Sequence, residues 1–328
     1  MSTVVYFKDA EQLPNALDEF DLRSFSHQSV PVKLHMGEMK NKYFPRPVFV
    51  KQVIDYLIDH EMQPFLTDTT VAYNAPRKSK SGYKKVAYLH GFSKKKIGCE
   101  VVIDDQGVPV EVEGRNYEVA DHLHKASCIV AISHVKGHVA SGFGGAIKNF
   151  GMGGVTKETK KRMHHGAKPV YTKDKCTFCG ICAEVCPFNA ITIKDNEWEK
   201  SERKCFGCGV CVDNCKTGGL QFEDASFQFV LACACKACVQ SKQVLYINDV
   251  NRIARSCDCD PFSGPIICPD VGYVVGMDPV AVDTVSLDLI DKQKDQVFYK
   301  EHHVDPRKQI LFGEQIGLGS RKYSLKEL

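Results

Sequence analysis

Two copies of one cysteine spacing constrain this chain more than any other feature. Each copy reads Cys-x-x-Cys-x-x-Cys-x-x-x-Cys, and the copies begin 29 residues apart, at Cys176 and Cys205. A cubane iron–sulfur cluster is held by four thiolates, and tight Cys-x-x-Cys turns can supply three of them from one loop. Structural zinc sites, the alternative, pair two Cys-x-x-Cys units and do not repeat a third cysteine three residues later. The spacing therefore predicts a segment that binds two [4Fe–4S] clusters.

Residues 168–224 as a whole resemble the two-[4Fe–4S] ferredoxin family. In that family the fourth cysteine of each run binds the cluster of the other run. The resemblance implies low-potential, one-electron transfer. It also implies two ligand sets, Cys176, Cys179, Cys182 and Cys215 for the first cluster and Cys205, Cys208, Cys211 and Cys186 for the second. One departure is Lys216, which stands where the first run has Pro187 and removes no ligand.

Six more cysteines follow this segment, at positions 233, 235, 238, 257, 259 and 268. A helix over Ser226–Lys242 would place Cys235 and Cys238 on one side and Cys233 nearly opposite. Residues i and i+2 of an extended segment share a face, which suits Cys257 and Cys259. We expect a third metal site, for zinc or an iron–sulfur cluster, built from Cys235, Cys238, Cys257 and Cys259, with Cys268 as a substitute. The alternative is a set of small buried side chains, since free cysteine packs well in cores.

Outside residues 168–224, strands and helices alternate. Strands are expected at Thr3–Phe7, Val30–Leu34, Pro64–Thr67, Ser127–Ser133, Val244–Ile247 and Tyr273–Val275, and helices at Ala10–Phe20, Arg46–His60, Gly82–His90 and Val280–Ile290, the last with Asp278 as its N-cap. Glu100–Ile103 and Val108–Val112 read as a strand pair joined at Asp104–Gly107. The pattern predicts an α/β fold, a mostly parallel sheet with flanking helices, interrupted by an inserted α+β ferredoxin-like module. The expected domains are residues 1–167 with 225–328, and the insert 168–224.

A glycine-rich segment follows the strand predicted at Ser127–Ser133. Ligands of open α/β sheets bind beyond the carboxyl ends of strands, and glycine-rich backbone exposes amides to an anion. The segment matches neither the Walker nor the Gly-x-Gly-x-x-Gly pattern, so it specifies no nucleotide. A tightly packed structural loop is the alternative. We expect cofactor-binding positions at Gly142, Gly144, Gly145, Lys136 and Asn149, and catalytic side chains at His35, His134, His138 and Lys148.

Charge and composition limit the kinds of partner and compartment that we expect. The chain has 43 basic and 40 acidic residues, a balance that does not demand a nucleic-acid partner. No apolar stretch is long enough to cross a bilayer, and the chain does not begin like a secretory leader. Its 16 cysteines then indicate metal binding or redox chemistry in a reducing, anaerobic cytoplasm. We expect a cytoplasmic protein without a membrane span that works with a redox partner protein, a ferredoxin or an oxidoreductase. Lysines between Lys78 and Lys96 suggest docking of an acidic partner or an anionic small molecule, or else a solvated surface.

Short motifs spread over nearly the whole chain carry a wider resemblance. They are Lys33-Leu-His-Met-Gly-Glu38, Thr67-Asp-Thr69, Ser133-His-Val-Lys-Gly-His138, Gly142-Phe-Gly-Gly-Ala-Ile-Lys-Asn149, Cys257-Asp-Cys259, Pro269-Asp270 and Asp278-Pro-Val-Ala-Val-Asp283. Together they resemble the family called domain of unknown function 362, in its ferredoxin-containing branch. That resemblance implies an iron–sulfur protein of bacteria or archaea and names no reaction.

Three functions are compatible with these patterns. The leading hypothesis is an iron–sulfur oxidoreductase that passes electrons through two [4Fe–4S] clusters to or from a substrate or organic cofactor bound in the α/β domain. A large α/β domain favours this function, because a carrier needs only the small module. The alternatives are an electron-transfer subunit or carrier that docks a redox partner, and a protein that delivers metal or clusters.

Overall fold

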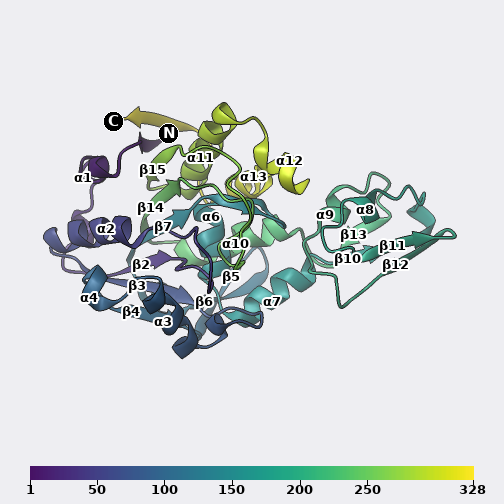
Figure 1. Cartoon of the computed structure of the whole chain (residues 1–328), viewed down its shortest axis with the longest axis horizontal. Coiled ribbons are helices and arrows are strands. Elements are labelled where there is room, and N and C mark those ends of the chain that lie inside the picture. Colours follow the sequence, from purple (N-terminus) through teal and green to yellow (C-terminus); the bar gives the residue numbers. More distant parts are fainter.

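The computed structural model describes residues 1–328 and is built around one eight-stranded sheet (Figure 1). Its strands are β1 (Ser2–Phe7), β2 (Ser29–Leu34), β3 (Gln63–Thr69), β4 (Val101–Asp104), β7 (Cys128–His134), β14 (Gln243–Val250), β15 (Gly272–Gly276) and β16 (Tyr323–Glu327), in the spatial order β16-β1-β15-β14-β7-β2-β3-β4. The run from β14 to β4 is parallel, as is the pair β1–β16, and β15 runs antiparallel to both of its neighbours. The predicted α/β fold with a mostly parallel sheet and flanking helices is confirmed.

Helices cover both faces of the sheet. One face packs against α1 (Leu13–Leu17), α2 (Pro47–Asp59), α3 (Lys80–Leu89) and α4 (Lys94–Ile97). The other packs against α5 (Asp121–Lys125), α6 (Ala146–Gly153), α7 (Lys157–Gly166), α10 (Phe227–Val239), α11 (Pro279–Gln293), α12 (Val297–His302) and α13 (Lys308–Gln315). Successive side chains of a strand point to opposite faces. Accordingly Ile129 and Ala131 of β7 join one core, while Val130 and Ile132 join the other.

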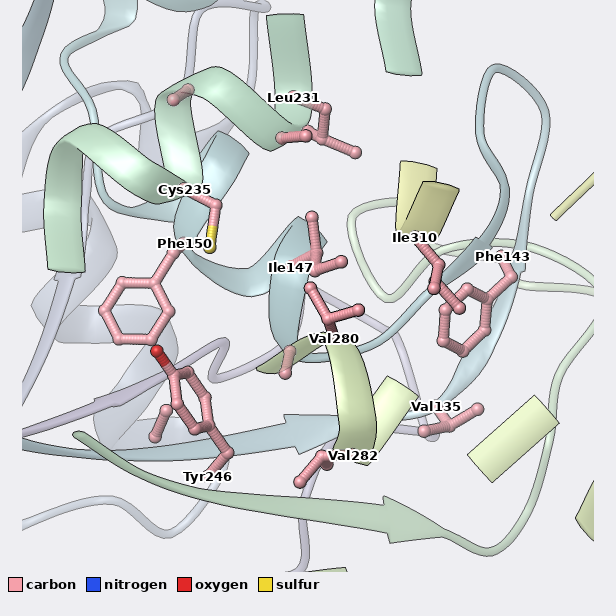
Figure 2. Packing of buried hydrophobic residues seen from close by; sticks show 14 of the residues in the cluster. Val135, Phe143, Ile147, Phe150, Leu231, Cys235, Tyr246, Val280, Val282 and Ile310 are labelled. Carbon is pink, nitrogen blue, oxygen red and sulfur yellow. The ribbon is translucent and has the colours of Figure 1, made fainter. Parts of the chain in front are cut away.

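The core beneath α6 and α10 is dense and apolar. Figure 2 shows Ile147 and Phe150 of α6 between Cys235 of α10 and Tyr246 of β14. Cys99 and Cys128 lie in the core on the other face of the sheet and are 5% and 2% exposed. The α11 helix begins as predicted, because the Asp278 side chain accepts hydrogen bonds from the amides of Val280 and Ala281.

Two local predictions were wrong. The segment Ala10–Phe20 forms only a 3-10 turn (Ala10–Gln12) followed by the short α1. The strand β5 (Gly107–Val112) pairs with β6 (Arg115–Ala120) rather than with β4. Glu113 and Gly114 both have positive φ, the geometry of a tight two-residue hairpin turn, and β4 is already paired with β3 in the main sheet.

The cysteine-rich segment lies at one end of the molecule, at the right of Figure 1. It contains β10 (Pro169–Tyr171), α8 (Ile181–Glu184), β11 (Ile191–Lys194), β12 (Glu197–Lys200), α9 (Val210–Asp213) and β13 (Leu220–Phe222). Its first and last strands, β10 and β13, pair with each other. The chain therefore leaves the main body and returns at one place. Ile191, Cys211 and Leu220 form a small core separate from the two main ones.

A short hairpin of β8 (Lys136–His138) and β9 (Gly142–Gly144) connects β7 to α6. It carries the glycine-rich segment to the carboxyl edge of the sheet. No helix has the length and apolar character that crossing a membrane requires.

Candidate functional site

A cleft separates the cysteine-rich segment from the carboxyl edge of the sheet. It consists of an inner cavity of about 400 Å³ and an outer hollow of about 960 Å³. The two parts share the lining residues Tyr73, His138, Phe206, Cys257 and Cys259. Hereafter "the cleft" means both parts. Ligands of α/β proteins commonly bind at this edge of the sheet.

Four cysteines from both runs meet beside this cleft. Cys186, Cys205, Cys208 and Cys211 line one small hollow, and Cys186 also lines the outer part of the cleft. The amide of Ala190 donates to the Cys186 sulfur at 3.3 Å. Burial, together with the neighbouring Cys186 and Cys205, raises the pKa of Cys208 to about 11. The Cys208 thiol would therefore ionise more readily beside a compensating positive charge, such as a bound metal supplies.

The other four cysteines of the two runs are Cys176, Cys179, Cys182 and Cys215. Cys182 and Cys215 pack against the small core of the segment, and Cys179 is exposed. The amide of Leu220 donates to the Cys215 sulfur at 3.3 Å. Gly219, the residue before Leu220, packs against Cys176, because a Cβ added to Gly219 would lie 3.2 Å from the Cα of Cys176. The start of β13 therefore contacts both Cys215 and Cys176.

The two runs have equivalent backbones. The helices α8 and α9 begin directly after Gly180 and Gly209, whose φ angles are 83° and 76°. These glycines follow the second cysteine of each run, where a left-handed residue turns the chain at little cost. No group of three or more His, Cys, Asp or Glu side chains is placed to hold a metal ion. A cubane carries four irons, so its thiolates stand farther apart than those around one ion.

The pair Cys257 and Cys259 faces the cleft from a turn. The amide of Asp260 donates to the carbonyl of Cys257 at 2.8 Å, so the segment is not extended as predicted. Between the two cysteines, Asp258 points inward and lies 2.9 Å from His134 and 3.1 Å from Lys136. The turn therefore anchors itself through its middle residue and leaves both sulfur atoms to the cleft.

Charge and hydrogen bonding set these two thiols apart. The Cys259 thiol, the nearby Lys148 and Lys136 hold the pKa of Cys257 well below its usual value, despite burial. The hydrogen bond between the two cysteine side chains, together with burial, raises the pKa of Cys259. The Lys148 ammonium lies 3.4 Å from the Cys257 sulfur, and the two sulfurs raise its pKa against the effect of burial. Cys257 is thus the thiolate of the pair and Cys259 the thiol.

The predicted third metal site is not assembled. Cys235 and Cys238 are fully buried in the core between α10 and α6, where the Cys238 sulfur lies 3.9 Å from the carbonyl of Phe150 (Figure 2 shows Cys235). Neither lines the cleft that holds Cys257 and Cys259. The inner face of α10 is occupied by packing against α6, so its cysteines serve as small apolar side chains.

The glycine-rich segment is a packing element rather than an anion site. Both carboxylate oxygens of Asp283 accept from the first amides of α6, from Ala146 at 2.7 Å and Ile147 at 2.9 Å. A protein carboxylate therefore occupies two amides of the glycine-rich segment that was expected to bind an anion. None of Gly142, Gly144 and Gly145 lines the cleft.

The remaining predicted side chains divide into two groups. His35, His138 and Lys148 line the cleft. His134, Lys136 and Asn149 do not line the cleft, and their polar atoms contact other groups of the protein. The two ring nitrogens of His134 contact Asp258 and the Asn251 carbonyl, and the Lys136 ammonium contacts the His134 carbonyl and Asp258. The Asn149 side chain contacts Lys33, Ser133 and the Ile132 carbonyl. The second group is structural.

His138 is held as a neutral ring. Its Nδ1 atom accepts from the amides of Ala140 and Ser141, both at 3.2 Å. Burial and then the Lys148 charge hold its pKa well below the usual value. A neutral imidazole that accepts at Nδ1 carries its proton on Nε2. His138 can therefore offer one hydrogen-bond donor to a ligand in the cleft.

Several lining residues were missed from the sequence. Arg77 is fully buried, donates to Glu38 at 2.9 Å and contacts His35 at 2.7 Å. Lys160 of α7 donates to the Thr69 hydroxyl and the Thr70 carbonyl at 2.6 Å, and burial lowers its pKa to about 7. The nearest signal in the sequence is the spacing of Lys160 and His164, which puts both on one side of α7.

Basic side chains outnumber acidic ones around the inner cavity. Its lining includes five lysine or arginine side chains, Arg77, Lys148, Lys160, Lys161 and Lys168, against one carboxylate, Asp68. Asp68 is itself paired with the buried Lys33 at 2.9 Å and accepts from Tyr83. Its charge is therefore already compensated. Arg77 and Lys168 are likewise paired, with Glu38 and Glu202, both at 2.9 Å, and Lys148 lies beside the Cys257 sulfur. The excess positive charge at the cavity therefore comes from Lys160 and Lys161.

Phe206 connects the cleft to the cysteine-rich segment. It stands between Cys205 and Gly207, lines both parts of the cleft, and lies 4.5 Å from the ring of His164. A Cβ at Gly207 would collide with the His164 carbonyl at 1.9 Å. Only glycine at this position lets the second cysteine run lie this close to α7.

Comparisons with known proteins describe the chain as follows. A family model described as domain of unknown function (DUF362) matches residues 30–288. No curated protein matches the chain. Among solved structures, a Thermotoga maritima protein aligns with 90% of this chain at a TM-score of 0.46 and 11% identity. The lactate racemase apoprotein of Thermoanaerobacterium thermosaccharolyticum aligns with 76% at a TM-score of 0.41 and 11% identity. The alignments cover 58% and 51% of those two chains, so this chain spans little more than half their length.

Proposed function

The chain belongs to the family described as domain of unknown function (DUF362), and on that premise we propose that it is an iron–sulfur oxidoreductase. In this proposal residues 168–224 are an inserted ferredoxin domain with two [4Fe–4S] clusters, and the cleft of the α/β domain binds the substrate. The clusters supply one-electron transfer at low potential. The remaining roles belong to side chains of this chain.

One observation carries the proposal. The cleft is lined on one side by Cys186 and Phe206 of the cysteine-rich segment and on the other by His138 and Cys257 of the α/β domain. A pure carrier would have no use for a hollow between its cluster-binding segment and a sheet edge. Cys186, Cys205, Cys208 and Cys211 are the set that would hold the second cluster. Because Cys186 also lines the cleft, that cluster would lie beside the substrate.

The lining of the cleft favours an anionic substrate. The excess of positive charge in the inner cavity attracts carboxylates and phosphates, and low-dielectric walls strengthen that attraction. His138 offers a neutral donor beside these cations. Lys160, with a pKa of about 7, can give or take a proton at neutral pH, which is what acid–base catalysis requires. We therefore propose a small organic anion as the substrate class.

The test uses protein purified without oxygen. Clusters reduced with dithionite are mixed with 2-oxo acids or aldose phosphates, whose carbonyl carbons can accept electrons, and the recovery of the cluster absorbance is followed. We expect at least one anion to reoxidise the clusters, and Lys148→Met to slow that reaction. Lys96→Met, an exposed lysine of α4, is the matched control. Equal rates in both variants would remove the cleft from the reaction.

A second function has its own supporting observation. Cys179, a member of the first ligand set, is exposed at the surface. A protein that exchanges electrons with a partner would present its cluster at such a surface. Reoxidation by an oxidised ferredoxin alone, insensitive to Lys148→Met, would favour a carrier over an enzyme.

A further inference from the structure

We propose that Cys257 and Cys259 form a reversible dithiol–disulfide pair that stores two electrons in the cleft. The inference rests on the proposed function for the source of those electrons, and it assigns a chemical role to two residues that a metal site does not use. Three observations support it: the turn that holds the pair, the ammonium beside one sulfur, and the access of both sulfurs to the cleft.

The turn brings the two residues within reach of each other. The hydrogen bond from Asp260 to the Cys257 carbonyl closes a turn over residues 257–260. Cys257 and Cys259 are two residues apart, so two Cα–Cα steps of about 3.8 Å each set the upper limit of their separation, and the bend of the turn shortens it towards the range of about 4.4–6.8 Å that disulfides span. The amide of Cys259 already donates to the Cys257 sulfur at 3.4 Å. Little backbone movement is needed for the two sulfurs to bond.

The surroundings give the two sulfurs different chemical roles. The Lys148 ammonium lies 3.4 Å from Cys257 and stabilises it as a thiolate, the nucleophilic form. Cys259 keeps its proton and is the resolving thiol. Asp258 cannot interfere, because its carboxylate is buried between His134 and Lys136 on the side away from the cleft.

The chemistry balances with a small disulfide as the oxidant. The Cys257 thiolate attacks one sulfur of the small disulfide and releases the other as a thiolate. Cys259 then loses its proton and displaces the second small thiol, which leaves the Cys257–Cys259 bond. Two electrons pass from the pair to the small disulfide, which becomes two thiols. The reverse steps with a small dithiol restore both cysteines.

The pair is also placed for exchange with a substrate. Cys257 and Cys259 both line the inner cavity and the outer hollow. The other cysteines outside the two runs, Cys99, Cys128, Cys233, Cys235, Cys238 and Cys268, are buried and line neither. Oxidation by a small molecule should therefore be confined to this pair among the cysteines that follow the two runs.

The experiment counts alkylated cysteines in one peptide of the intact, cluster-containing protein. Trypsin cuts after Arg255 and Lys292 and releases a peptide with Cys257, Cys259 and Cys268. Samples are treated anaerobically with oxidised glutathione or left reduced, quenched in acid, alkylated while unfolded and analysed by mass spectrometry. We expect three alkylated cysteines in the reduced sample and one, Cys268, in the oxidised sample. Treatment with dithiothreitol should restore three.

The single variants test the order of attack. Cys259→Ser should accumulate a mixed disulfide with glutathione on Cys257, whereas Cys257→Ser should form at least tenfold less adduct on Cys259. Cys128→Ser is the control. Three alkylated cysteines in the oxidised wild-type sample would overturn the inference, as would a further metal ion that the Cys257→Ser variant loses. Iron and sulfide content of the same samples reports separately on the proposed function, so the two can fail independently.

Discussion

The ammonium nitrogen of Lys148 lies 3.4 Å from the sulfur of Cys257, although 109 positions separate the two residues in sequence. Lys148 stands near the start of α6, and Cys257 on a turn beyond the end of β14. The contact joins the glycine-rich segment to the Cys257-Asp-Cys259 motif, two features with no connection in the sequence. It also gives the cleft a stabilised thiolate.

Replacing Lys148 should make Cys257 less reactive at neutral pH. The ammonium is one cause of the lowered pKa of Cys257, so in Lys148→Met this pKa moves upward towards that of an ordinary thiol. Once the pKa lies above 7, each further rise by one pH unit lowers the thiolate fraction at pH 7 about tenfold. The rate of Cys257 alkylation between pH 5 and 10 measures this. An unchanged midpoint in Lys148→Met, equal to that of Lys96→Met, would show that the ammonium does not act on the sulfur.

The two cysteine runs should hold about eight irons and eight sulfides per chain. Cys186→Ser and Cys208→Ser should both lower the iron content and perturb the same cluster, because these sulfurs line one hollow. Cys215→Ser should perturb the other cluster. Electron paramagnetic resonance of the reduced proteins identifies which signal is lost. The buried Cys128→Ser should match the wild type, and loss of the same signal in Cys186→Ser and Cys215→Ser would contradict the crossed ligand sets.

Lys160 should make stability depend on pH in a predictable direction. Its folded pKa of about 7 lies below the ordinary value of 10.5, so between these pH values the unfolded chain binds one more proton. Its contribution to folding stability therefore rises with pH, by about 1.4 kcal/mol per pH unit. Lys160→Met should be the more stable protein at pH 7 and lose about 2 kcal/mol of that advantage by pH 9. Denaturant unfolding at both pH values measures the change. The exposed neighbour variant Lys161→Met retains Lys160 and should keep the pH dependence of the wild type.

Removing the carboxylate of Asp283 should destabilise the fold. Three buried donors lose their acceptor in Asp283→Ala: the amides of Ala146 and Ile147, and the side-chain amide of Asn248 at 2.8 Å. Each unsatisfied donor costs about 1–3 kcal/mol. The pKa of Asp283 is raised by burial to about 6, so removal also relieves part of the cost of burying its charge. We expect a net loss of about 2–4 kcal/mol in the free energy of unfolding. The exposed Asp59→Ala should change it by less than about 0.5 kcal/mol.

Secondary structure was predictable where the signal is local. The run of apolar residues at Ser127–Ser133 and the Asp278-Pro279 start of α11 depend on neighbours in sequence, and both were confirmed. The predicted pairing of Glu100–Ile103 with Val108–Val112 was wrong, because the chain turns back at Glu113–Gly114 and not at Asp104–Gly107. The hairpin at Glu113–Gly114 accommodates two positive φ angles, whereas the residues after Asp104 lead out of the main sheet.

The candidate site was predictable only in part. His35, His138 and Lys148 follow strands whose carboxyl ends meet at one edge, so general rules for α/β sheets located them. The same rules suggested an anion at the glycine-rich segment, and no pattern in the sequence reveals that Asp283 already binds the amides where α6 begins. Arg77 and Lys160 lie on segments without a motif, and their burial is a consequence of packing.

By itself the sequence determined the α/β alternation, the capping of α11 and a repeated ligand spacing, because these depend on residues a few positions apart. Only the tertiary structure decided which cysteines share an environment. It placed Cys235 and Cys238 in a core and Cys257 and Cys259 in a cleft, since a helix face that packs against α6 cannot also face a ligand. It also placed Phe206, Lys160 and Lys148 around one cavity. A parallel sheet brings segments that are distant in sequence to the same edge, and the spacing of residues along the chain does not show which segments meet there.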